Sequence, residues 1–325
     1  MKKDLVIGVD CSTTASKAVV WDMQGRPVSE GRKTFPLLNP YPTWWEQKAE
    51  EWWEATACAL RQAMSTVAPG RIAALCMTHQ RETFVPVDEK GKPLRNAIPW
   101  MDERSRPQVA QMENLYGEEK IHRLTGKPVS MTPSVYKIIW MKEHEVAIFE
   151  RVYKYLDVHA YLVFKMTGQF KTGWGCADPL GVFDMQNFCW AEDLLEALGL
   201  HLDQFPEAFP PGAVLGEVTN EAATQCGLPP GLPVVAGLGD GQSAGLGANI
   251  TSPGQAYLNL GTAVVSGAYS ASYATDLAFR TMCGGIPRTY LLETDLKWGT
   301  YIINWFVDKF GGVVPQLNLS TEEIF

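Results

Sequence analysis

The chain lacks the marks of a membrane, secreted or nucleic-acid-binding protein. No apolar run approaches the roughly 20 residues that span a membrane. Met1, Lys2 and Lys3 lead straight into a predicted strand, without the apolar core of a signal peptide. The net charge of -8 argues against a nucleic-acid partner, because phosphate backbones bind basic surfaces. We therefore expect a cytoplasmic protein with no nucleic-acid and no membrane partner.

Cysteine is scarce and follows no pattern. The chain has 7 cysteines, an odd number, and no two of them are spaced as CxxC. The cysteines of disulfide frameworks and zinc sites usually have an even count or a recognisable spacing. We expect buried thiols of a reducing compartment, with neither a disulfide framework nor a zinc site. Cys11 alone lies beside a predicted site, where we expect it to serve packing.

The remaining composition is that of an ordinary globular protein. With 325 residues, 46% of them apolar and 20% charged, the chain has room for two domains and a large core. Trp53, Ala57 and Leu60 recur every three or four positions, which predicts an amphipathic helix. A buried strand is predicted over residues 72–77, and another helix over residues 187–198. This alternation indicates an α/β fold.

The first loop of the chain suggests phosphate binding without a Walker lysine. A strand over residues 5–9 ends at Asp10, turns through Ser12, Thr13 and Thr14, and returns as a strand over residues 17–21. Backbone N–H groups and hydroxyls in such a turn can contact a phosphate, and the carboxylate can hold a hydrated divalent cation. The alternative is an ordinary hairpin, in which these side chains only satisfy the turn.

Polar residues also follow the predicted strand over residues 72–77. The segment QRET, residues 80–83, stands where that strand should leave the sheet. Open α/β sheets place their sites at the carboxyl ends of their strands. The alternative for this segment is a surface ion pair between Arg81 and Glu82, with Trp100 as a core residue.

Asp240 lies between a predicted strand over residues 234–238 and a predicted helix. The positive end of the helix dipole would keep its carboxylate ionised. A positioned carboxylate can accept the proton of a hydroxyl that attacks a γ-phosphate. A simple N-cap would explain the position of Asp240 but not the glycines on both sides of it.

The same stretch, GDGQSA, also satisfies the GxGxxA fingerprint of NAD-binding dehydrogenases. That fingerprint requires an acidic residue about 20 positions further on, at the end of the next strand. Residues 259–262, with sequence NLGT, stand there instead. The dehydrogenase stays open as an alternative, and a fluorescence titration with NAD(H) would separate the two possibilities.

These segments together resemble the FGGY family of carbohydrate kinases, which share the actin and hexokinase ATPase fold. Residues 257–264 repeat the strand-turn-strand pattern of the first loop, as the duplicated fold of that family requires. The resemblance implies an α/β, actin-like ATPase (ribonuclease H-like) fold that uses ATP and Mg²⁺. Ser12 stands where many members carry Gly, which we expect to be tolerated if its φ stays negative. By the match, the metal is held through Asp10, the catalytic base is Asp240, and the phosphates are bound by Thr13, Thr14, Lys17, Gly261 and Thr262.

The acceptor segment resembles two branches of the family. Arg81, Glu82 and Trp100 match the polyol-binding segment of glycerol kinases, but Thr132 stands near a position where glycerol kinases carry Tyr. Xylulose kinases are matched instead by the acceptor residues Asp102 and Gln242. We expect a ketopentose such as xylulose, with glycerol or another polyol as the alternative and a non-catalytic sugar-binding protein as a further class. Transfer of a γ-phosphate would exclude that last class.

Members of the family continue well past Phe325, and the resemblance places most of the adenine site there. We expect a complete N-terminal domain over residues 1–236, an incomplete C-terminal domain over residues 237–325, and no kinase activity from the 325-residue chain alone. Uncovered apolar side chains would favour self-association, with a homodimer as one possibility. These side chains are those of Val264, Ile302, Trp305 and Phe306.

Overall fold

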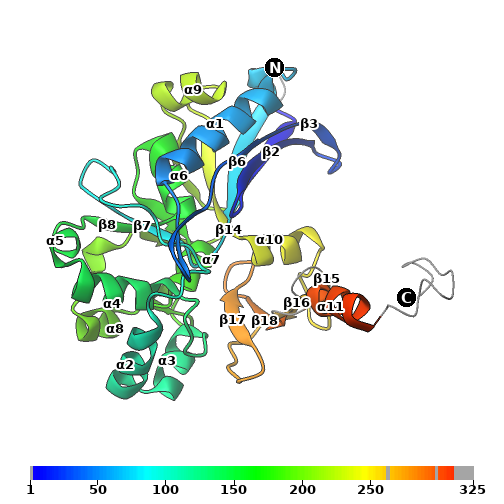
Figure 1. The fold of residues 1–325 in the computed structure, drawn as a ribbon. Coiled ribbons are helices and arrows are strands. Elements are labelled where there is room, and N and C mark those ends of the chain that lie inside the picture. Colours follow the sequence, from blue (N-terminus) through cyan, green and yellow to red (C-terminus); the bar gives the residue numbers. More distant parts are fainter. Residues whose placement is uncertain (1–2, 261–263, 297–298, 311–325) are drawn as a thin grey trace.

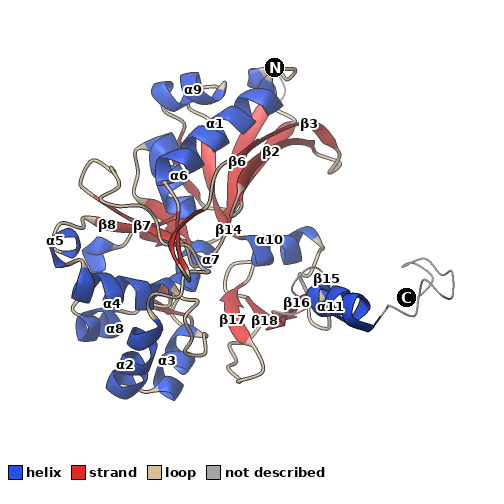
Figure 2. Ribbon diagram, in the orientation of Figure 1, coloured by secondary structure: helices blue, strands red, loops and turns tan. Residues whose placement is uncertain are grey.

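The computed structural model describes residues 3–260, 264–296 and 299–310 of the chain. Two sheets organise this part of the protein, one of six strands and one of four. Helix α10 (Asp240–Gly247) lies between them (Figures 1 and 2). No helix among the described residues is long and apolar enough to cross a membrane.

The six-stranded sheet has the order β13-β14-β6-β1-β2-β3. In chain order its strands are β1 (Leu5–Cys11), β2 (Ala15–Asp22), β3 (Pro27–Thr34), β6 (Ile72–His79), β13 (Val214–Glu217) and β14 (Pro233–Gly239). Strands β1, β6 and β14 run parallel, so their carboxyl ends meet at one edge. Asp10 lies beside Thr78 at this edge, and His79 lies beside Gly239. The three polar segments predicted to follow strands therefore come together.

One face of this sheet is covered by helices α1 (Ala49–Met64), α6 (Val158–Thr167) and α9 (Asn220–Cys226) (Figure 2). Leu5, Ile7 and Val9 of β1 are buried and alternate with half-buried residues, because successive side chains of a strand point to opposite faces. They belong to the same core as Trp52 and Leu60 of α1. The predicted helical stripe is confirmed: Trp53, Ala57, Leu60 and Met64 are all buried.

A second core lies in the helical part of the chain, to the lower left in Figure 1. Its helices are α2 (Arg106–Tyr116), α3 (Glu118–Thr125), α4 (Ser134–His144), α5 (Val146–Phe149) and α8 (Glu192–Leu198). Two-stranded pairs accompany them: β4 (Leu38–Tyr41) with β5 (Trp44–Glu46), β7 (Phe84–Val87) with β8 (Lys154–Asp157), β9 (Lys171–Gly173) with β12 (Glu207–Phe209), and β10 (Phe183–Asp184) with β11 (Cys189–Trp190). Short helical turns are η1 (Pro69–Arg71), α7 (Trp174–Ala177), η2 (Asp178–Leu180) and η3 (Leu202–Gln204).

The helix predicted over residues 187–198 was wrong in its first half. Strand β11 pairs with β10 there, so a tight hairpin replaces the first predicted turn of helix. Phe188 in that hairpin has a φ of 55°, a left-handed conformation that interrupts any helix. Helix α8 begins only at Glu192.

The four-stranded sheet has the order β15-β16-β18-β17. Its strands are β15 (Ala256–Leu260), β16 (Val264–Ser270), β17 (Arg280–Cys283) and β18 (Tyr290–Leu296), and helix α11 (Thr300–Phe310) follows. Thr281 joins this sheet to the helical part, since its N–H donates to the carbonyl of Gly126 at 2.8 Å. Ile302, Trp305 and Phe306 of α11 are about half exposed, as predicted, whereas Val264 is half-buried.

Gly237 marks a close approach between the two central strands. The register of β14 against β6 shifts between Val235 and Leu238. A Cβ atom on Gly237 would lie 1.8 Å from the carbonyl oxygen of Met77, so no other residue fits without moving the strand. Strand β14 also runs as one element through residue 236, where the predicted domains divide, and that division stays a prediction.

Candidate active site

A cavity of about 510 Å³ opens where the strand ends of the larger sheet face the smaller sheet. From the larger sheet and the segments that follow it come Arg81, Trp100 and Asp240, and from the smaller sheet come Arg280 and Asp295. The other lining residues are Glu82, Met101, Asp102, Glu103, Met131, Thr132 and Val265. The structure thus brings most of the predicted acceptor residues to one cavity.

Asp10 has a carboxylate oxygen without a partner. Its Oδ1 is buried and accepts no hydrogen bond from any described residue. Burial, together with the negative charge of Asp240, raises the pKa of Asp10 to about 6, and His79 opposes this only in part. A divalent cation would supply the missing positive charge, so Asp10 fits the Mg²⁺ that the family resemblance implies.

The first loop has the tight conformation expected of it. The N–H and hydroxyl of Ser12 both donate to the carbonyl of Ala15, at 2.9 and 3.0 Å. Ser12 is not among the described residues with positive φ, so the expected negative φ is confirmed. The carbonyl of Thr13 accepts from Gln47 Nε2 at 2.6 Å, and its hydroxyl accepts from Trp100 Nε1 at 3.2 Å. Trp100 therefore lies between the loop and the cavity.

The other residues that were predicted to bind phosphate differ in their surroundings. Thr14 is exposed. Lys17 forms an ion pair with Glu30 at 2.8 Å, on the surface of the neighbouring strand. Gly261 and Thr262 lie outside the described residues.

A network of buried charges fixes the floor of the cavity. Arg81 Nε lies 2.9 Å from Asp240 Oδ1, and Arg81 Nη1 lies 3.0 Å from Glu293 Oε2. Arg280 pairs with Glu293 at 2.6 Å and with Glu82 at 2.8 Å. Burial alone would raise the pKa of Glu293, but Arg81 and Arg280 outweigh it and lower that pKa to about 2. The two sheets are thus joined by charges that satisfy one another.

Glu82 has a strained backbone, with a φ of 51°. Such a conformation costs a residue other than glycine about 1–3 kcal/mol and persists only where its surroundings enforce it. Here Arg280 Nη1 donates to the Glu82 carboxylate at 2.8 Å. In this conformation Glu82 lines the cavity and binds the smaller sheet through Arg280.

Two predicted acceptor residues have side chains that are already hydrogen-bonded to other parts of the protein. The carboxylate of Asp102 is buried and accepts from Arg104 Nε at 2.9 Å and from the N–H of Trp45 at 2.6 Å. Gln242 is buried and donates to the carbonyl of Gly175 at 3.0 Å, and it does not line the cavity. Asp240 and Gln242 are two positions apart at the start of α10, so their side chains point in different directions.

Arg280 and Glu293 are site residues that the sequence analysis missed. They face each other on the antiparallel strands β17 and β18. Opposite charges in such a pair stabilise a sheet, but the loop between the strands carries no short hairpin signal that would have set this register. A second, open hollow of about 650 Å³ lies on the helical part around Lys120 and Cys189, away from the strand ends.

The comparisons with known proteins agree with the geometry. The model of the FGGY family of carbohydrate kinases, N-terminal domain, matches residues 5–247. The xylulose kinase of Staphylococcus epidermidis is 28% identical over 95% of this chain and 62% of its own length. The glycerol kinase of Thermococcus gammatolerans is 28% identical over 98% of the chain and 65% of its length, and the gluconokinase of Bacillus subtilis is 23% identical over 94% and 60%.

The crystal structure of xylulose kinase from Rhodospirillum rubrum superimposes with a TM-score of 0.91 at 27% identity, covering 94% of this chain and 63% of that one. The chain thus spans less than two thirds of the length of these relatives. The predicted fold class, the actin-like ATPase fold, is confirmed. Because the family model covers most of the chain, this protein is a member of the FGGY family of carbohydrate kinases.

Proposed function

We propose that this protein takes part in the ATP-dependent phosphorylation of a hydroxyl group on a small neutral sugar, with a ketopentose such as xylulose as the first candidate. The observation that carries the proposal is the meeting of Asp10, Arg81 and Asp240 at one edge of the larger sheet, beside a cavity. A cytoplasmic location goes with this function and stays a prediction.

Asp240 is the proposed general base. Its side chain is 52% exposed at the cavity, yet Arg81 Nε at 2.9 Å and the N–H of Gly241 at 2.8 Å fix its carboxylate. A carboxylate held in this way can take the proton of an acceptor hydroxyl as that oxygen attacks the γ-phosphate. The proton then resides on Asp240 until the product leaves.

Asp10 is the proposed metal-holding residue, and Thr13 and Thr14 are proposed to contact the phosphates. Mg²⁺, when bound with ATP, neutralises charge on the phosphoryl group that is transferred. The unpartnered oxygen of Asp10 supports this assignment. In a chain extended to the full length of its relatives, Asp10→Asn is expected to abolish phosphoryl transfer, and unchanged turnover would contradict the assignment. Roles in phosphate binding for Lys17, Gly261 and Thr262 stay predictions.

The charge of the cavity favours an uncharged acceptor. Five carboxylates line the cavity, those of Glu82, Asp102, Glu103, Asp240 and Asp295, against the two arginines Arg81 and Arg280. Asp102, Glu103 and Asp240 are paired with Arg104, Arg106 and Arg81, and Asp295 adds a further negative charge to the cavity wall. Arg280 is already paired twice. A carboxylate-bearing acceptor such as gluconate would be repelled, whereas hydroxyl groups can donate to the acids, and Trp100, 41% exposed, can pack on a carbon chain.

The glycines around Asp240 have a packing explanation that weakens the dehydrogenase alternative. A Cβ atom on Gly239 would lie 2.4 Å from Arg81 Cγ, and one on Gly241 would lie 2.6 Å from Glu293 Oε2. These side chains occupy the space next to the start of α10, where a dinucleotide-binding fold places its pyrophosphate. NAD(H) titration remains the direct test, and we expect no fluorescence change.

Acceptor binding and turnover are best measured separately. Calorimetric titration of the chain with xylulose, glycerol and gluconate should give the tightest binding for xylulose and none for gluconate. Trp100→Ala should weaken binding, while Tyr41→Ala, an exposed aromatic residue outside the cavity, should not. ADP release with the same compounds, from a chain extended to the full length of its relatives, tests the reaction itself. Exclusive use of glycerol, a hexose or an amino sugar would overturn the ketopentose assignment.

A further inference from the structure

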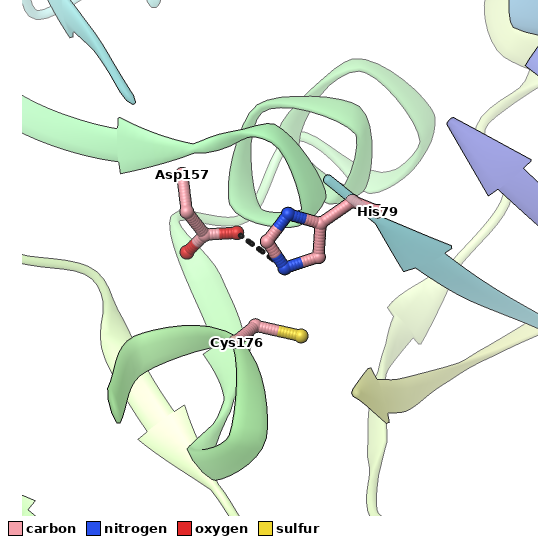
Figure 3. Close-up of side chains that lie close together, drawn as sticks. All are labelled: His79, Asp157 and Cys176. Atoms are coloured by element: carbon pink, nitrogen blue, oxygen red, sulfur yellow. Dashed lines mark ion pairs between the residues drawn. The ribbon is translucent and has the colours of Figure 1, made fainter. Parts of the chain in front are cut away.

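Three buried side chains converge beneath the end of strand β6 (Figure 3). His79 is the last residue of β6, Asp157 precedes the first turn of α6, and Cys176 lies in α7. One ligand atom from each lies within 4.8 Å of the other two, and all three side chains are at most 1% exposed. We propose that they bind a structural zinc ion, distinct from the Mg²⁺ assigned to Asp10.

The tautomer of His79 leaves a lone pair that points into this cluster. Its Nδ1 lies 2.6 Å from the carbonyl of Gln80, which can only accept, so Nδ1 carries the proton. Its Nε2 is buried and has no hydrogen-bond partner among the described residues. An imidazole that donates to a backbone carbonyl through one nitrogen and offers the other is typical of a metal ligand.

Asp157 is a buried carboxylate that no Lys or Arg side chain of the described residues contacts. It accepts from the N–H of Ala160 and the hydroxyl of Thr172, both at 2.9 Å, which leaves further lone pairs on its oxygens. In the described part of the chain its ion-pair contact is with His79 Nε2, at 3.8 Å, which is too long for a hydrogen bond. A metal ion between these two atoms would satisfy both.

The neighbouring His159 does not supply the missing charge. Its Nε2 accepts from the N–H of Gly237 at 3.2 Å, so that nitrogen carries no proton. His159 therefore stays neutral and helps to hold Thr172, whose hydroxyl lies 3.3 Å from its Nδ1.

The donor set selects zinc. A thiolate, an imidazole and a carboxylate together are ligands of Zn²⁺, whereas Mg²⁺ prefers oxygen ligands alone. Zinc bond lengths of about 2.0–2.3 Å set ligand atoms roughly 3.3–3.8 Å apart, so small side-chain shifts complete the site around the observed 3.8 Å contact. Binding of zinc to Cys176 would release the proton of its thiol.

The charge balance favours the loaded site. One thiolate and one carboxylate neutralise Zn²⁺, and His79 adds no charge, so the buried cluster becomes neutral as a whole. A water molecule would complete four-coordination. The ion would tie together β6, α6 and α7, and β6 is the strand that leads to Arg81. The inference concerns stability and does not depend on the proposed function.

To test the zinc site, bound metal is removed from the 325-residue chain with a chelator, and the chain is then titrated with Zn²⁺ and with Co²⁺. We expect a single zinc ion per chain by elemental analysis, a rise in Tm, and a cobalt–thiolate absorption band. Cys176→Ser should remove the band and lower zinc affinity at least about tenfold. Cys226→Ser is the matched control, because Cys226 is also fully buried but is the last residue of α9 and does not belong to the cluster, and it should keep the band.

His79→Gln provides a second variant, since Gln can still fill the space but binds zinc poorly. A folded wild-type chain that shows no Tm rise and no cobalt–thiolate band would overturn the proposal. A band that persists in Cys176→Ser would also overturn it, because the metal would then be bound by exposed thiols such as Cys76 or Cys189.

Discussion

Two carboxylates in the candidate site have pKa values shifted in opposite directions. Asp10 has an unpartnered oxygen and a pKa raised to about 6, while Glu293 is bound by two arginines and its pKa is lowered to about 2. The region around Glu293 is electrically complete, because its charges satisfy one another. The region around Asp10 is incomplete, because Oδ1 has no hydrogen-bond partner among the described residues.

Removing the residue between these two regions should have the largest effect. Asp240 pairs with Arg81 and also raises the pKa of Asp10. Asp240→Asn cannot accept a proton, so we expect turnover to fall by about 10²–10⁴, the usual contribution of a general base. ADP release measures this in a chain extended to the full length of its relatives, because the 325-residue chain alone is expected to be inactive. Glu89→Gln, on an exposed turn, is the control. Turnover within a few-fold of wild type would mean that another group is the base.

Breaking the complete region should cost stability. In Glu293→Gln, the buried charges of Arg81 and Arg280 lose their shared partner, so the free energy of unfolding should fall by about 3–5 kcal/mol. Glu30→Gln is the matched control, because its pair with Lys17 is exposed and such pairs contribute about 0–1 kcal/mol. Urea denaturation near neutral pH compares the two. Equal stability of both variants would show that the network is not what joins the sheets.

Removing the charge of Asp10, in the incomplete region, should instead increase stability. In chelator-containing buffer, folded Asp10 keeps a proton between the ordinary aspartate pKa of 3.8 and about 6, while the unfolded chain has released it. Stability therefore falls as pH rises through this window. Asp10→Asn should be more stable than wild type above pH 6, by up to about 3 kcal/mol, and equally stable near pH 4. Excess Mg²⁺ should reduce this difference in the free energy of unfolding between Asp10→Asn and wild type. A difference that grows as the pH is lowered would contradict the assignment.

The contribution of Glu293 has the reverse pH dependence. Its folded pKa lies below the ordinary glutamate value of 4.5, so its stabilisation is present above that value and is lost as pH falls towards about 2. The difference between wild type and Glu293→Gln should therefore shrink over this acid range. Denaturation curves at pH 7 and pH 3 would show it, and a constant difference would rule out ionic pairing as its cause.

The smallest effect is expected for Lys17, the basic residue opposite Asp10 on β2. Its ammonium group pairs with Glu30 on the surface, so Lys17→Ala should change stability by less than about 1 kcal/mol. The pH dependence that distinguishes Asp10→Asn from wild type should persist unchanged in this background. A large change would mean that Lys17 is a cationic partner of Asp10 after all.

The sequence was sufficient where chemistry follows directly from a strand. Asp10, Arg81 and Asp240 each come just after an apolar run, and parallel pairing of β1, β6 and β14 makes such positions neighbours. The family and fold class followed from the same loops.

The sequence was insufficient where the partners of a residue are distant in the chain, or where its role depends on which side of a helix it lies. Arg280 and Glu293 lie about 200 positions from Glu82 and Arg81, their partners across the cavity, and each looks like an ordinary strand residue. Gln242 was assigned from its spacing to Asp240, but the rotation of a helix turns a residue two positions on away from the cavity. His79, Asp157 and Cys176 have no common spacing, so only the fold reveals their cluster.

Gly237 has a consequence for how this chain tolerates change. It touches no acceptor and carries no side chain, yet a single added methyl group would meet the carbonyl of Met77 at 1.8 Å. Its N–H also binds His159, and Asp240 follows three positions later. In a library of all single substitutions, position 237 should be as intolerant as a catalytic position. Its replacement would shift the end of β14 together with Asp240 at the start of α10. No change of pH, metal or substrate would reverse that shift.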